Sequence, residues 1–218
     1  MLLALDTATR MVSIALHDGH TLIAESSWRS KNNHTVELSP AVEAMMQQAE
    51  VTPADLQSIA VLRGPGSFTG LRIGMSFAKG LAFASPSTVS LISIPTLDVV
   101  AAAQPHESDT LYALSQAGRS RFNAMCYHWG DDEWKAEGDP LLLTAQDLLK
   151  QLEPPVQVAG ELDSVSRQLF ASEGKGIILK GGAYELRRAG FLAELAICRL
   201  RAGDIDDPAM LTPLYLHD

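Results

Sequence analysis

The chain lacks most of the features that mark secreted, membrane or metal-binding proteins. It has only two cysteines, Cys126 and Cys198, and neither has a Cys or His at a spacing typical of zinc ligands. No apolar run approaches the roughly 20 residues of a membrane span. The apolar start at residues 1–5 has neither the length nor the basic flank of a signal peptide. We therefore expect a mature, cytoplasmic protein with reduced thiols and no membrane contact.

Positive charge is also scarce. The chain has 17 Lys and Arg against 26 Asp and Glu, which gives a net charge of -9 and a pI of about 5.1. No window is rich in Lys and Arg, and an acidic surface repels a phosphate backbone. A content of 46% apolar and 20% charged residues is typical of a soluble globular protein. We expect any nucleic acid to be contacted only through a partner.

Hydrophobic periodicity and turn signals predict the same order of elements in both halves of the chain. The first half reads as strands at 2–5, 11–16 and 21–28, a helix at 35–49, a strand at 59–62, a helix at 67–84, a strand at 89–94 and a helix at 95–103. The second half reads as strands at 111–115, 121–129 and 133–137, a helix at 144–152, a strand at 156–159, a helix at 163–172, a strand at 177–179 and a helix at 185–202.

A three-strand meander followed by crossover units predicts a mixed sheet covered by helices, used twice. This is the layout of the duplicated actin-like (ASKHA, ribonuclease-H-like) α/β fold. We expect a first domain at 1–104 and a second at 105–203, with the tail 204–218 packed on the first domain.

In catalytic proteins of this fold, the hairpin after the first strand binds phosphate. An Asp there contacts Mg²⁺ through water, and a following Gly lets the backbone approach the phosphate. Here the hairpin keeps Asp6, Thr7 and Thr9, but Ala8 stands about where the glycine is expected. Two interpretations stay open: weak binding of a nucleotide phosphate, or a turn closed by side-chain-to-backbone bonds of Asp6 and Thr9.

Residues 63–74 form the most distinctive segment, with a strand end, two glycines around a proline and a helix start. Free N–H groups at such a helix start suit an anion. However, Phe68 adds apolar bulk and no P-loop lysine follows, so we favour a structural or partner-facing loop over an anion site. The candidate residues of either site are Gly64, Gly66, Ser67, Thr69 and Gly70. No carboxylate pair, nucleophile elbow or helical histidine pair is present, so we predict no catalytic residue, metal ligand or cofactor.

Three segments resemble the TsaB (YeaZ) family. They are residues 3–9 with 12–16, the glycine-rich segment 64–74, which is close to the family's most specific signature, and the ending at 213–216. The middle of the chain is similar mainly in the order of elements and in Arg119. Such proteins tend to carry Asp-Ala-Arg there, whereas this chain has Ala117-Gly118-Arg119.

The resemblance implies a non-catalytic subunit for threonylcarbamoylation of adenosine 37 in tRNAs that read ANN codons. Such a subunit pairs with a TsaD-type catalytic paralogue, works with a TsaE-type ATPase, meets tRNA only through the complex, and forms a homodimer when alone. The paralogue carries two metal-binding histidines at positions that match Thr96 and Val100 here, and neither residue can replace an imidazole. The alternative is a small actin-like-fold ATPase or kinase, while missing ligands argue against a metallopeptidase.

The helix at 35–49 is the predicted partner surface, because the family implies that this helix packs against its counterpart. Met45 and Met46 are adjacent, so both cannot lie at the centre of one buried stripe. We expect one of them to face outward, where Met suits a contact that can repack; the alternative is that neighbouring loops cover both. The predicted contact residues are Leu38, Val42, Glu43, Met45 and Met46.

Overall fold

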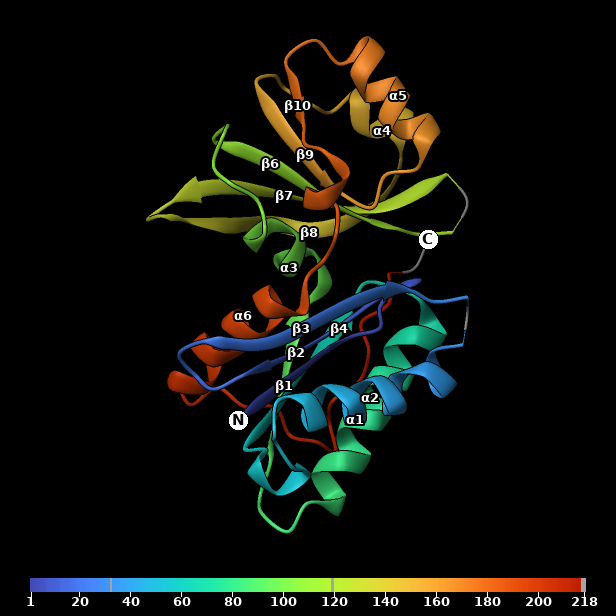
Figure 1. Ribbon diagram of the computed structural model, residues 1–218. Helices are drawn as coiled ribbons and strands as arrows, with labels where there is room; N and C mark the ends of the chain where they lie inside the picture. Colours follow the sequence, from blue (N-terminus) through green and yellow to red (C-terminus); the bar gives the residue numbers. More distant parts are fainter. Residues whose placement is uncertain (32, 119, 217–218) are drawn as a thin grey trace. The chain divides into compact units, whose positions relative to one another are not determined.

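The computed structural model describes residues 1–31, 33–118 and 120–216 (Figure 1). The chain divides into two compact units. The first contains Met1–Pro95 and Arg188–Leu214, and the second contains Thr96–Arg187 with Tyr215 and Leu216. Among the described helices, none has the length and apolar character needed to cross a membrane.

The first unit is built on a five-stranded mixed sheet with the order β3-β2-β1-β4-β5. The strands β1 to β3 form an antiparallel meander, and β4 and β5 run parallel to β1. A short 3₁₀ turn at Pro53–Asp55 precedes β4. The strands are β1 (Leu2–Asp6), β2 (Met11–His17), β3 (Leu22–Arg29), β4 (Ser58–Gly64) and β5 (Ser90–Pro95).

Helices α1 (His34–Gln48) and α2 (Phe68–Ala84) cover one face of this sheet. The alternation along each strand directs its large apolar side chains to that face, where they form one core with both helices. Strand residues of this core include Leu3, Leu5, Val12, Ile14, Leu16, Ile59 and Val61.

The other face of the first sheet carries small side chains and packs against α6 (Ala189–Arg201). Ala4 lies opposite Ala15 on β2 and opposite Ala60 on β4, so three alanines stand side by side across three strands. Ser13 lies on the same face, and its Oγ accepts a hydrogen bond of 2.9 Å from the N–H of Ala189. Small side chains let the helix approach the sheet closely, and Figure 1 shows α6 on the side of the sheet opposite α1 and α2.

The second unit repeats this plan. Its sheet has the order β10-β9-β6-β7-β8, which is the order of the first sheet read from the other edge, with the same parallel and antiparallel pairs. The duplicated fold predicted from the sequence is therefore confirmed. The strands are β6 (Thr110–Gln116), β7 (Arg121–Gly130), β8 (Glu133–Thr144), β9 (Val156–Gly160) and β10 (Ile177–Leu179).

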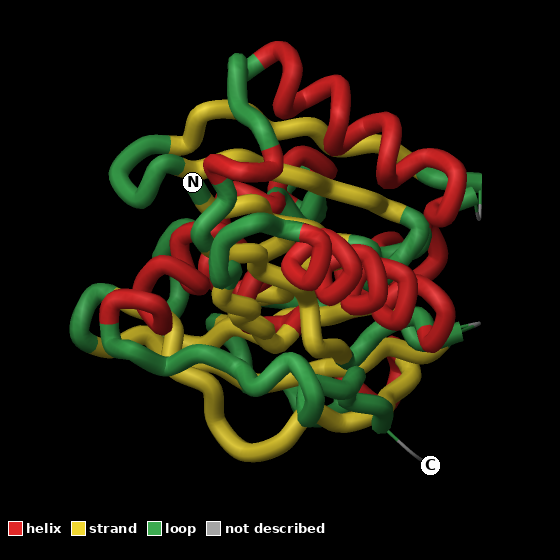
Figure 2. The backbone as a smooth tube through the Cα atoms, turned by 90° about the horizontal axis from the view of Figure 1, so that it is seen from below, coloured by secondary structure: helices red, strands yellow, loops and turns green. Residues whose placement is uncertain are grey.

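Helices again cover both faces of the second sheet. Phe122 and Phe170 are fully buried in a core with α4 (Ala145–Leu149) and α5 (Ser164–Glu173). On the other face, Leu97 and Val100 of α3 (Thr96–Ala102) pack with Tyr127. Figure 2 shows, in a second view, helices lying against the strands.

Several elements differ from their predicted bounds. We expected the last strand of the second meander to end at 137, but β8 continues to Thr144 and leaves only Ala145–Leu149 for the following helix. The last helix was expected from 185, but a 3₁₀ turn at Gly182–Tyr184 comes first and α6 begins at Ala189. Between them Arg187 is buried and pairs with Glu161 at 3.0 Å, so this stretch turns inward.

The grouping of helices also differs from the domain limits 1–104 and 105–203. Contacts place α3 with the second unit and α6 with the first, because each helix buries its apolar face on that unit's sheet. In the tail 204–218, Leu211 is buried in the core of the first unit. Residues 217–218 of this tail lie outside the described residues.

Candidate functional site

The hairpin between β1 and β2 is closed by its own polar side chains. The Asp6 carboxylate accepts a hydrogen bond from the N–H of Ala8 at 2.9 Å, and the Thr9 hydroxyl accepts one from the N–H of Met11 at 3.2 Å. His34 at the start of α1 lies with its Nε2 2.8 Å from the Thr9 carbonyl oxygen, to which it donates. Asp6, Thr7, Ala8 and Thr9 are all buried. These are the bonds that the turn interpretation of the hairpin predicts.

The glycine-rich segment packs directly on this hairpin. The N–H of Ser67 donates to the Ala8 carbonyl oxygen at 2.7 Å, and the Thr7 hydroxyl donates to the Gly70 carbonyl oxygen at 2.8 Å. A Cβ at Gly66 would lie 2.7 Å from the Ala8 carbonyl oxygen, and one at Gly70 would overlap the Thr7 carbonyl oxygen. The glycines are therefore required by close backbone packing, whatever else the segment does.

The start of α2 is capped beside this packing. Ser67 caps the helix, because its Oγ accepts from the N–H of Gly70 at 3.2 Å. Phe68 is 54% exposed, and the Arg72 guanidinium lies 3.7 Å from the centroid of its ring. Thr69 is also exposed. The helix start thus presents an aromatic–cation pair to its surroundings, beside a backbone that is already hydrogen-bonded to the hairpin.

The C-terminal tail closes the other side of the segment. Gly64 has a φ of +112°, which disfavours a side chain, and a Cβ there would overlap the Leu214 carbonyl oxygen. The N–H of Leu214 donates to the Arg63 carbonyl oxygen at 2.7 Å. Further along α2, Lys79 Nζ donates to the Leu211 carbonyl oxygen at 2.8 Å. The hairpin, the glycine-rich segment and Leu214 of the C-terminal ending, far apart in sequence, therefore meet at one place in the first unit.

The expectation that Met45 or Met46 faces outward is wrong. Met45 is 6% and Met46 is 5% exposed, and Leu38 and Val42 are buried in the same core. The helix packs against β2 and β3 on one side and against α2 on another, so its buried stripe is wide enough for two adjacent residues. Of the five predicted contact residues, Glu43 alone is exposed.

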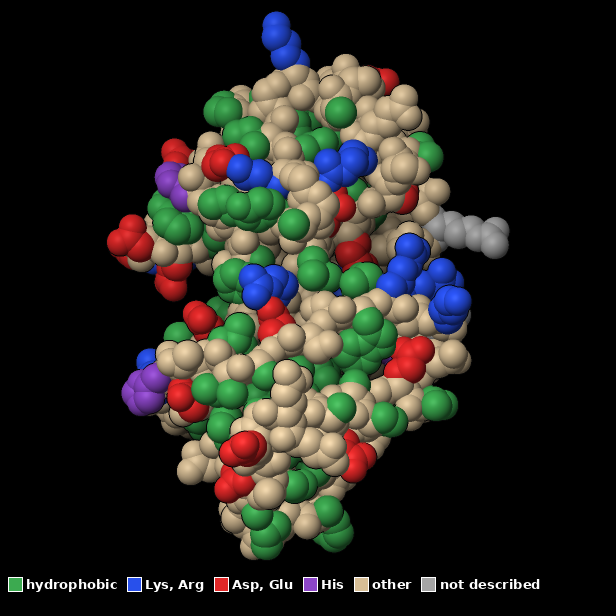
Figure 3. Space-filling model, viewed as in Figure 1, with side chains coloured by type: hydrophobic (Ala, Val, Ile, Leu, Met, Phe, Trp, Pro, Cys, Tyr) green, Lys and Arg blue, Asp and Glu red, His purple; other side chains and the backbone are tan. Residues whose placement is uncertain are grey.

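The exposed side of α1 carries other residues than its buried side. It includes Val36, Glu43 and Ala44, and Val36 is 73% exposed. On α2, Phe83 is 94% exposed. Figure 3 shows hydrophobic side chains spread between acidic ones on the visible surface of the first unit over these helices.

The positions that the resemblance pairs with metal ligands of the paralogue lie on α3 in the second unit. Thr96 and Val100 are both buried, and Val100 belongs to the core with Leu97 and Tyr127. Tyr127 donates a hydrogen bond of 2.7 Å to Asp98, and burial raises the pKa of its hydroxyl. This helix therefore serves the core of its unit. Arg119, the remaining position of the resemblance, lies outside the described residues.

One side-chain cluster was missed by the sequence analysis. Cys126, His128 and Glu137 meet on β7 and β8, although we found no Cys or His at metal-ligand spacing. Two residues two apart on a strand do not match the spacings typical of zinc motifs or of helical ligand pairs. Residues two apart on a strand share a face, and this period-2 relation was the signal that could have found the pair.

Comparison with known proteins finds relatives of this chain. A family model described as "TsaD: tRNA N6-adenosine threonylcarbamoyltransferase" matches residues 22–170. The TsaB protein of Bacillus subtilis is 31% identical over 172 residues, covering 78% of this chain and 74% of its own length. The Escherichia coli TsaB protein is 26% identical over 224 residues, covering 100% of this chain and 94% of its own length.

A solved structure, "YeaZ from Pseudomonas aeruginosa", has the same fold with a TM-score of 0.76 and 24% identity, covering 99% of each chain. The curated relatives carry the name "tRNA threonylcarbamoyladenosine biosynthesis protein TsaB". The chain belongs to the family that the TsaD model describes and, within it, to the TsaB (YeaZ) proteins.

Proposed function

We propose that this protein is a cytoplasmic, non-catalytic subunit for threonylcarbamoylation of adenosine 37 in tRNAs that read ANN codons. It activates a TsaD-type catalytic paralogue and works together with a TsaE-type ATPase. Its membership of the TsaB proteins, whose relatives are named for threonylcarbamoyladenosine biosynthesis, supports the pathway. The acidic charge of -9 is consistent with tRNA contact made through the complex.

The observation that carries the non-catalytic role is the packing of the hairpin. Thr7 and Ala8 are buried under Gly66, Ser67 and Gly70, and the N–H groups of Ala8 and Ser67 are already bonded within the protein. A phosphate at this hairpin would need those donors. The residues at the paralogue's ligand positions, Thr96 and Val100, offer no imidazole to a metal ion.

The test of this function is reconstitution. Threonylcarbamoylation of tRNA is measured with the cognate TsaD-type and TsaE-type proteins, with and without this chain. We expect activity only when this chain is added and none from this chain alone. Full activity without it would refute the activating role, and ATP hydrolysis by the purified chain would favour the ATPase alternative.

We further propose that the exposed side of α1, continuous with α2, is the surface that binds the paralogue, and that it pairs with a second copy when the paralogue is absent. Val36 and Ala44 supply exposed apolar contact area on α1, where Glu43 lies seven residues after Val36 and so on the same side, and Phe83 is an exposed apolar residue of α2. The other four predicted contact residues lie in the core beneath the helix and would not touch the partner. They are Leu38, Val42, Met45 and Met46.

Charge reversal tests the surface without disturbing the core. Glu43→Arg combined with Ala44→Arg should weaken binding to the paralogue by at least about tenfold, while thermal unfolding stays unchanged. Glu194→Arg is the matched control, because Glu194 is also exposed on a helix but lies on α6, across the first sheet. Equal binding by the double variant and the control would place the surface elsewhere.

A further inference from the structure

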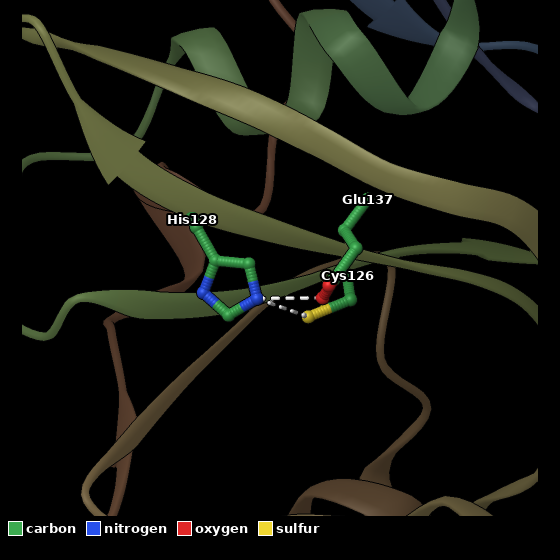
Figure 4. A group of neighbouring side chains, drawn as sticks. All are labelled: Cys126, His128 and Glu137. Atoms are coloured by element: carbon green, nitrogen blue, oxygen red, sulfur yellow. Dashed lines mark hydrogen bonds and ion pairs between the residues drawn. The ribbon is translucent and has the colours of Figure 1, made fainter.

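Three side chains that can all bind a metal ion converge on the hairpin formed by β7 and β8. His128 Nε2 lies 2.6 Å from Glu137 Oε2 and 3.8 Å from Cys126 Sγ. One ligand atom from each residue lies within 4.8 Å of the others. Figure 4 shows the Nε2 edge of the imidazole directed toward both the sulfur and the carboxylate.

The strand register produces this arrangement. Cys126 and His128 are two residues apart on β7, so both project from the same face. Cys126 lies directly opposite Glu137 on β8, which brings the carboxylate to that face too. A register shift after Ala124 sets this pairing. The paired strands β7 and β8 thus position a sulfur, a nitrogen and an oxygen ligand together, and none of the three comes from a loop.

The outer contact of His128 has the form found at metal-binding histidines. Its Nδ1 lies 3.4 Å from Thr110 Oγ1 on the neighbouring strand β6, opposite which His128 is paired. Once a metal ion replaces the Nε2 proton that bonds Glu137, a hydrogen bond from Nδ1–H to that oxygen would hold the ring with its Nε2 toward the ion. Such outer contacts typically orient the ligand and increase its basicity.

We propose that Cys126, His128 and Glu137 bind one zinc ion per chain, with water in the fourth position. Sulfur, imidazole nitrogen and carboxylate oxygen are the donors that tetrahedral zinc accepts. Ligand atoms around such an ion stand about 3.5 Å apart, so the 3.8 Å between Cys126 Sγ and His128 Nε2 already fits. The 2.6 Å contact between His128 Nε2 and Glu137 Oε2 is a hydrogen bond in the free protein. When the ion binds, it takes the place of this bond, and one of the two exposed side chains moves outward to make room.

Two features oppose metal binding and set its strength. Burial raises the pKa of the Cys126 thiol, so the ion must displace a proton that the free protein holds firmly. His128 and Glu137 are exposed, with side chains 49% and 65% accessible, so ordering them costs conformational entropy. A site of moderate affinity, open at one coordination position, is the expected result.

The experiment titrates the metal-free, full-length protein with Co²⁺ and then with Zn²⁺. Cobalt should give a thiolate-to-metal charge-transfer absorption and saturate at one ion per chain, and zinc should displace it. Cys126→Ser should abolish the absorption, and Glu137→Gln should weaken zinc binding. Thr110→Val should weaken binding by about tenfold, since it removes only the outer contact of His128.

Two matched variants serve as controls. Cys198→Ser removes the other cysteine, which is exposed on α6, and His106→Asn removes an exposed histidine that pairs with Asp109. Both should bind as the parent protein does, and urea unfolding of every variant verifies that it is folded. Retained cobalt absorption in folded Cys126→Ser, its loss in Cys198→Ser, or saturation at one ion per two chains would overturn the proposed site.

Discussion

The hydroxyl of Thr7 donates a hydrogen bond to the Gly70 carbonyl oxygen across 63 residues of sequence, at 2.8 Å. The same Thr7 presents its carbonyl oxygen to the position where a Cβ of residue 70 would stand. The hairpin after the first strand and the first turn of α2 are therefore fitted to each other at the level of single atoms. This fit explains why the segment carries glycine there, independently of any ligand.

Gly70→Ala should destabilise the protein, because the added methyl group meets backbone atoms of Thr7 that cannot move aside. We expect a loss of about 3 kcal/mol in the free energy of unfolding, measured in urea. Gly80→Ala is the control in the same helix, since nothing lies within 4 Å of its Cβ position. That control should stabilise by about 0.5–1 kcal/mol, the ordinary helix preference of Ala over Gly. Equal stability of the two variants would contradict the proposed fit.

Met45→Ala should cost about 2–5 kcal/mol in the free energy of unfolding, because it empties part of the core between α1, α2 and the sheet. Glu43→Arg, two residues away on the exposed side, should change it by less than about 0.5 kcal/mol. Chemical unfolding of the two variants distinguishes the buried side of α1 from the exposed one. A small effect of Met45→Ala would show that this methionine faces solvent.

Ala15→Leu should destabilise the first unit by about 1–3 kcal/mol, because Ala15 stands in the row of small residues beneath α6. The added carbon atoms would push the helix from the sheet. Ala136→Leu on β8 is the control, since Ala136 is an exposed strand residue and its replacement should change stability by less than about 0.5 kcal/mol. Urea unfolding of both proteins gives the comparison.

Glu37 should titrate below the ordinary glutamate value of 4.5. The Trp28 indole N–H donates to its carboxylate at 2.9 Å, and this bond favours the ionised form and lowers the pKa. Its contribution to stability is present above pH 4.5 and is lost as the pH falls through the lowered value. Carbon NMR of the Glu37 carboxyl measures the shift, and Trp28→Phe should move that pKa upward. An identical pKa in both proteins would exclude the indole as the main cause.

The order of strands and helices could be predicted from the sequence because its signals are local. Short, mostly apolar runs mark β1 and β2 as buried strands, and Asp18-Gly19 marks the turn between β2 and β3. The burial of both Met45 and Met46 could not be predicted in this way, because it depends on α1 packing against both the sheet and α2. Helical periodicity assumes one contact surface, whereas this helix has two.

The candidate site was predictable in its parts and not in its assembly. The hairpin at Asp6–Thr9 and the glycine segment were both selected from sequence, but the close approach that joins Ala8 to Gly66 becomes visible only in three dimensions. The Cys126, His128 and Glu137 cluster required the register of β7 on β8, including its irregularity after Ala124. Cross-strand register depends on distant packing and leaves no short motif.

The placement of α3 and α6 has a consequence for how the chain is made. The first sheet lies within residues 1–95, yet the helix over one of its faces comes from Arg188–Leu214. During synthesis, that face has no cover until Ala189–Arg201 has been translated and has left the ribosome. The second unit, continuous over Thr96–Arg187, already has its strands and helices by then. Of the two units, the one whose sheet is translated first is therefore the last to be completed.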